Sequence, residues 1–195
     1  MLKLQTLTKI YLNEQLEAMQ NAKRENRLRV ANLVLENPAL MPFLIEQVFE
    51  IENKLSIKAA WTLELVCEQQ LNLLVPYLAT FVTKINTLKH DSAVRPASKI
   101  CNFLAIAYKA KKNPLITKNL TSEHINRIIE TGFDWMLSNH KVATKAYTMN
   151  ALFLLGKNTD WAHQELKLIL EQNIPKESAA YKARGKITLA LINKK

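Results

Sequence analysis

Apolar residues recur along this chain with the three- to four-residue spacing of amphipathic helices, and no stretch alternates apolar and polar residues long enough to indicate a strand. A first helix is expected from Leu2 to about Gln20, and a second is expected to end at Glu36, before Asn37-Pro38. Further helices are expected near 40–51, 73–88, 122–137 and 159–172, and a last one from Ser178. The pattern predicts an all-α protein of about ten helices.

One short phrase recurs at the start of four apolar helices. Its copies are Ser56-Ile-Lys58-Ala59, Ala93-Val-Arg95-Pro96, Ala143-Thr-Lys145-Ala146 and Ala180-Tyr-Lys182-Ala183. The cations of successive copies are 37, 50 and 37 residues apart, which is the spacing of stacked helical hairpins. Repeats are therefore expected at 22–53, 54–90, 91–139 and 140–175, with a terminal half-repeat from 176.

The repeats predict a single domain over residues 1–195. The helices of 1–53 are less regular, 54–195 holds the repeats, and 176–195 is expected to cap the array as a half-repeat. Helical hairpins with one apolar side must stack on their neighbours to bury it. Val66, Phe103 and Phe153 follow their cations at the same spacing and are expected in the core. Ser56 is expected to cap the helix that it precedes.

The segment Asp91-Ser-Ala-Val-Arg95 resembles the D-x-x-V-R start of HEAT repeats, the helical hairpins that stack into curved solenoids. The other copies keep the cation, while only Asp91 supplies the acid of that family. The resemblance covers about 54–195 well and 22–53 weakly. It implies an armadillo-like α-α superhelix, a HEAT-like solenoid with a concave recognition surface, and it implies no catalytic residues.

A narrower similarity links the chain to the HEAT-like alkylpurine DNA glycosylases, which are also small, all-helical and basic. That similarity implies aromatic residues and a carboxylate facing a DNA groove, for which Trp61, Asp134-Trp135 and Asp160-Trp161 are the candidates. The Trp-x-x-x-Asp spacing of that family is absent, and Glu165, four residues after Trp161, is a partial equivalent. The sequence therefore favours a protein that is not an enzyme.

Positive charge is concentrated in the C-terminal part of the chain. Residues 1–80 hold 8 Lys and Arg against 9 Asp and Glu, whereas residues 81–195 hold 19 against 8, within a net charge of +10. Such asymmetry indicates an anionic partner, because a surface of one sign attracts opposite charge, although lysines can also serve solubility alone. The candidate basic binding strip consists of Arg95, Lys99, Lys141, Lys145, Lys182, Arg184 and Lys186.

The repeat-equivalent cations of this strip have an alternative role. Arg95, Lys145 and Lys182 would form a column if the repeats stack regularly, but each could instead pair with an acid of a neighbouring repeat. A second basic candidate is the inserted loop at 108–120, which lengthens one repeat, since insertions in arrays often map to the binding face. This candidate basic loop carries Lys109, Lys111, Lys112 and Lys118.

Motifs for enzymatic chemistry are missing from the sequence. The glycine patterns that bind phosphates or form a nucleophile elbow do not occur. The four histidines show no zinc-ligand spacing, and the two cysteines form no C-x-x-C pair. These residues are His90, His124, His140, His163, Cys67 and Cys101. We therefore expect no metal, no cofactor and no catalytic residues.

Compartment and function are inferred from the remaining features. Reduced cysteines, the lack of a signal-peptide pattern and the lack of a long apolar run predict a cytoplasmic protein without a membrane partner. One function is a HEAT-like adaptor or scaffold that recognises a protein partner through its curved surface. The alternative is a nucleic-acid-binding module that binds DNA or RNA through the basic C-terminal half. The lack of interleaved aromatic residues favours the adaptor, and the charge favours nucleic acid.

Overall fold

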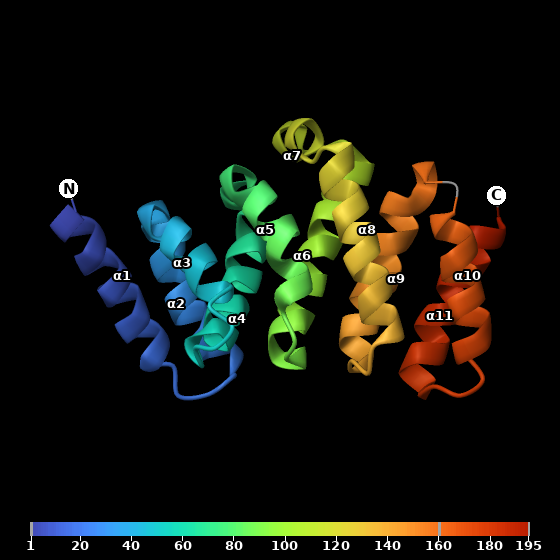
Figure 1. Ribbon diagram of the computed structural model, residues 1–195, viewed down its shortest axis with the longest axis horizontal. Helices are drawn as coiled ribbons and strands as arrows, with labels where there is room; N and C mark the ends of the chain where they lie inside the picture. The colour runs from blue at the N-terminus through green and yellow to red at the C-terminus, as the bar shows by residue number, and fades with distance from the viewer. Residues whose placement is uncertain (1, 160, 195) are drawn as a thin grey trace. The chain divides into compact units, whose positions relative to one another are not determined.

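The computed structural model describes residues 2–159 and 161–194 of the chain (Figure 1). Over these residues it forms eleven α-helices and four short 3-10 helices, and no strand. The predicted all-α class is confirmed. The helix that the sequence did not predict is α7 (Pro114–Asn119), which lies within the segment expected to be a loop.

The helices gather into two compact units, residues 1–97 and 98–195. The division between the units falls within the long helix α6 (Asp91–Ala110), which contains Pro96 in its interior. Because Pro96 has no N–H, the carbonyl oxygen of Ser92 lacks its usual helical partner, and it accepts the indole N–H of Trp61 instead. The single repeat domain expected from the sequence stays a prediction, as does the solenoid arrangement.

Unit 1 is built around α4. Its α-helices before α6 are α1 (Leu2–Glu17), α2 (Arg24–Glu36), α3 (Met41–Val48), α4 (Leu55–Gln69) and α5 (Leu78–Lys84). Helix α4 packs against α2 and α3 and also touches α1, and it buries Leu63, Leu65 and Val66. The expected core position of Val66 is therefore confirmed. The predicted end of α2 at Glu36, before Asn37-Pro38, is also confirmed.

Two local expectations in unit 1 are wrong. Ser56 does not cap α4, because the helix begins one residue earlier and Ser56 is buried inside it, while the Asn53 side chain accepts the backbone N–H of Leu55 at 2.9 Å. The single helix expected at 73–88 is divided into a 3-10 helix (Leu71–Tyr77), α5 and a second 3-10 helix (Ile85–Thr87). Pro76 prevents a continuous α-helix here, because it lacks an N–H and its ring clashes with the preceding turn.

One buried polar group in unit 1 is unusual. Gln47 of α3 is fully buried, and neither polar atom of its side-chain amide has a hydrogen-bond partner among the described residues. Most buried amides are paired, since an unpaired one loses its hydrogen bonds to water without replacement.

Among the described residues, no single helix is both long and apolar enough to cross a bilayer. One bent pair, Arg24–Glu36 with Pro38–Val48, meets the length and composition requirement only when its two parts are taken together across a 105° bend. Both parts carry side chains that are buried in unit 1, such as Val34 and Leu44.

Unit 2 is centred on α9. After α6 its helices are α7, α8 (Ser122–Leu137), α9 (Val142–Leu155), α10 (Ala162–Asn173) and α11 (Ala179–Asn193), which follow one another in Figure 1. Helix α9 packs against α8, α10 and α11. The predicted bounds of α8 are confirmed, because Thr121 and His124 form a reciprocal capping box at its start.

The inserted segment of unit 2 contains a short helix, α7. Asn113 accepts the backbone N–H of Ile116 through its side chain, Pro114 occupies the first turn of α7, and Ile116 is buried. The expectation of a plain loop over 108–120 is therefore wrong, since a capped turn with one apolar anchor forms there.

Two glycines allow close packing between helices of unit 2. A Cβ placed on Gly132 of α8 would lie 2.9 Å from Leu152 Cδ2 of α9, and one on Gly185 of α11 would lie 3.0 Å from Ile174 Cγ1. Neither position has room for a large side chain.

Candidate functional site

The repeat-equivalent cation Arg95 lies in an ion pair within unit 1. Its Nη2 is 2.8 Å from Oε2 of Glu64 on α4, and the Glu64 side chain is only 2% exposed. A carboxylate taken this far from water requires compensation by charge or hydrogen bonds. Arg95 therefore has a structural role, in agreement with the alternative that these cations pair with acids of neighbouring repeats.

Lys145 of α9 is held in a similar way within unit 2. Its Nζ is 3.2 Å from Oε1 of Glu177 and 5.8 Å from the centre of the buried Tyr181 ring on α11. Lys58, the first cation of the repeated phrase, donates to the backbone oxygen of Glu17 at 3.0 Å. Three of the four repeated cations thus connect their helices to other segments of the same unit.

The rest of the candidate basic strip is more accessible. Lys99 lies near the rings of Phe103 and Tyr147, at 5.3 and 6.0 Å from their centres. Phe103 and Phe153 are half-buried, so the expectation that they lie in the core is wrong. Lys141, Arg184 and Lys186 are exposed, and Lys182 is half-buried. Binding of an anionic partner by these residues stays a prediction.

The four lysines of the candidate basic loop are exposed. Lys109 belongs to the last turn of α6, and Lys118 belongs to the last turn of α7. Lys111 and Lys112 lie between the two helices, where Lys111 has a positive φ of 53°. The structure thus presents these cations to solvent next to a capped turn.

Helix α11 has two different faces. Tyr181, Gly185 and Thr188 are buried toward α9 and α10. The opposite face exposes small and apolar residues at helical spacing, with cations beside them. These residues are Ala180, Ala183, Ile187, Ala190 and Leu191, with Arg184, Lys186 and Lys194. The sequence-based predictions did not include this face, although the spacing of Ala183, Ile187 and Leu191 is visible in the sequence.

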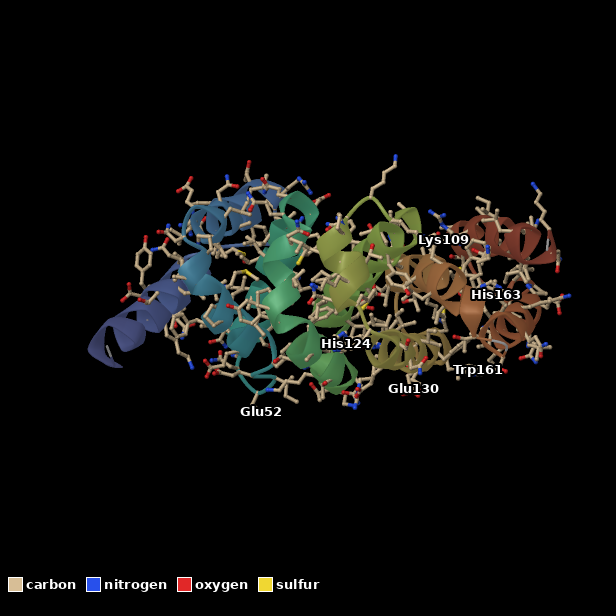
Figure 2. The ribbon with its side chains drawn as sticks, turned by 90° about the horizontal axis from the view of Figure 1, so that it is seen from above. Glu52, Lys109, His124, Glu130, Trp161 and His163 are labelled. Carbon is tan, nitrogen blue, oxygen red and sulfur yellow. The ribbon has the colours of Figure 1, made fainter. Side chains whose placement is uncertain are left out.

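The three tryptophans have different environments. Trp61 donates its indole N–H to the backbone oxygen of Ser92 at 2.9 Å, and Trp135 is buried. Trp161 is 49% exposed and packs on Phe133, with 5.2 Å between ring centres; Figure 2 shows it along the same edge of unit 2 as Glu130. The candidate carboxylate Asp160 lies outside the described residues, and Asp134 is exposed.

Two of the four histidines serve local structure. His124 takes part in the cap of α8, and His163 donates Nε2–H to the backbone oxygen of Phe153 at 2.8 Å. The carbonyl oxygen of Phe153 belongs to the last turn of α9 and lacks a partner within that helix. Over the described residues, no group of three His, Cys, Asp or Glu side chains is arranged to hold a metal ion.

The two cysteines are buried thiols, and Cys101 has a consequence at high pH. Burial raises the pKa of the Cys101 thiol from an ordinary 9.0 to about 12. Between these values the unfolded chain releases this proton and the folded chain keeps it. The free energy of unfolding should therefore fall by about 1.4 kcal/mol per pH unit from this group.

This pH dependence of the free energy of unfolding is measured by urea unfolding of the natural chain and of Cys101→Ala at pH 7.5 and 10.5. The natural chain should lose about 2 kcal/mol more than Cys101→Ala over this interval. The difference between the two proteins at pH 7.5 gives the effect of the smaller side chain alone, before the thiol ionises. Equal losses in the two proteins would contradict the prediction.

No protein-family model matches the chain, and no curated protein or solved structure gives a significant match. The similarities to HEAT repeats and to glycosylases therefore stay predictions. The assignment of function depends on the residues and the geometry described above.

Proposed function

We propose that the chain is a HEAT-like adaptor, an α-solenoid without catalytic activity that binds an acidic protein partner through unit 2. The observation that carries this proposal is the exposed face of α11, where Ile187 is 54% exposed beside Arg184 and Lys186. An acidic amphipathic helix complements such a face, because its apolar residues cover the apolar stripe and its carboxylates meet the flanking cations.

The charge of unit 2 supports an acidic partner. Residues 98–195 hold 16 Lys and Arg against 7 Asp and Glu. The ion pairs of Arg95 and Lys145 support a protein partner over a polyanion, because two members of the expected phosphate-binding column are already paired with carboxylates. Paired cations contribute less to phosphate neutralisation than free ones.

The test is binding of a fluorescent acidic amphipathic peptide, with Glu and Leu at helical spacing, to the full chain. Ile187→Glu should weaken binding at least about tenfold, because it removes the apolar anchor and adds a repelling charge. Leu137→Glu on α8 is the matched control, since Leu137 is 68% exposed in the same unit and the charge change is equal. Lack of binding, or equal effects of the two substitutions, would contradict the proposal.

Nucleic-acid binding is the second candidate, and the exposed lysines 109, 111, 112 and 118 favour it. Its test is titration of duplex and single-stranded DNA and RNA over a salt series. Phosphate binding would give a log–log slope near −0.9 per phosphate neutralised on duplex DNA. Lys111→Gln and Lys112→Gln should then flatten the slope, whereas Ile187→Glu should have little effect on it.

A further inference from the structure

A cavity of about 230 Å³ in unit 2 is lined by residues of α6, α9, α10 and α11 and of the 3-10 helix Gly156–Asn158. Its cations are Lys109 from the end of α6, Lys157 just after α9, and Lys194 just after α11. Its apolar lining comes from Phe153, Leu154 and Leu191. No carboxylate is among the described residues that line it.

One wall of this cavity is held in place by a stacked pair. The rings of Phe153 and His163 are 5.4 Å apart and nearly parallel at 7°, and the His163 Nε2–H donates to the Phe153 carbonyl oxygen. Gly156 allows the close approach, because a Cβ there would lie 3.2 Å from His163 Cδ2. The wall is therefore formed before any ligand arrives, which lowers the entropic cost of binding.

The lysines also have a simpler role, since a cation near a helix C-terminus interacts favourably with the helix dipole. That role explains one lysine at each helix end. It does not require the three lysines to line one cavity together with a flat aromatic wall. A concave site with cations and low-dielectric walls concentrates the positive potential inside it.

We propose that this cavity binds a small organic anion with a flat apolar body, of the size of an aromatic carboxylate. The volume corresponds to roughly seven or eight water molecules, which suits a single ring with one acidic group. The ring lies against Phe153, and the carboxylate meets Lys157 and Lys194. The cavity shares Leu191 and Lys194 with the exposed face of α11, but the two proposals are tested at different residues, the peptide site at Ile187 and the anion site at Lys157 and Leu154.

The experiment uses the full chain and three probes of nearly equal shape: benzoate, benzamide and benzamidine. Binding is followed by saturation-transfer NMR and by chemical-shift titration. Benzoate should bind about fivefold more tightly than neutral benzamide, and cationic benzamidine should bind most weakly. Equal affinities for benzoate and benzamide would overturn the proposal.

Variants locate the bound probe. Lys157→Met and Lys194→Met should each weaken benzoate binding about fivefold and leave benzamide unchanged, while the matched control Lys118→Met, an exposed lysine outside the cavity, should change neither. Leu154→Trp should abolish binding of all three probes by filling the cavity. The lysine variants keep the test decisive if Leu154→Trp does not fold. An effect of Lys118→Met equal to that of Lys157→Met would overturn the assignment.

Discussion

Replacing Arg95 by Met is expected to lower the free energy of unfolding by about 3 kcal/mol. The substitution keeps most of the aliphatic stem but removes the guanidinium that lies 2.8 Å from the buried Glu64 carboxylate. Removal of one partner from a buried pair leaves the other charge poorly compensated, and this costs more than the pair itself contributes. Urea unfolding followed by circular dichroism measures the change.

Two further variants separate the ion pair from general effects. Arg184→Met, at an exposed arginine, should change stability by less than about 0.5 kcal/mol. The double variant Glu64→Leu/Arg95→Met should recover most of the loss, because no buried charge is left without its partner. If Arg95→Met were as mild as Arg184→Met, Arg95 would be available as a binding residue instead.

Gly132→Leu is expected to destabilise the chain by about 3 kcal/mol, because the new side chain has no space between α8 and α9. Even a Cβ at this position would lie 2.9 Å from Leu152 Cδ2 and 3.4 Å from Thr148 Cγ2. Both of these side chains are buried, so they can move only by disturbing their neighbours. Thermal and urea unfolding both report the loss.

A smaller side chain at position 132 and a leucine at an exposed position are the controls for Gly132→Leu. Gly132→Ala should cost about 1 kcal/mol or less, since the Leu152 methyl group can shift and alanine favours the helix. Ala143→Leu, at an exposed position of α9, should stay within about 0.5 kcal/mol. A loss from Gly132→Leu as small as that from Ala143→Leu would show that the helices can separate without cost.

Helix boundaries were predictable where side chains supply the capping hydrogen bonds. Thr121 and His124 define the start of α8 locally, and Ser178 accepts the backbone N–H of Tyr181 at the start of α11. The break at Pro76 was missed because apolar spacing continues through it. Helix α7 was missed because a six-residue helix is too short for periodicity to register.

The candidate sites were only partly predictable, because contacts join residues far apart in sequence. The repeated phrase identified Arg95 and Lys145 as equivalent positions. Their acids lie 31 and 32 residues away, one before its cation and one after it, so the sequence repeat gives no rule for the pairing. The cavity of unit 2 combines ends of several helices, and Lys157 and Lys194 belong to no repeated position.

The unpaired amide of Gln47 bears on how this sequence can change over evolutionary time. A buried amide without partners costs about 1 to 3 kcal/mol, so an apolar side chain of similar length at this position would make the unit more stable. Natural chains are selected for sufficient rather than maximal stability. The gain available at position 47 is therefore a reserve of mutational tolerance, which could offset destabilising changes as the exposed surfaces adapt to new partners.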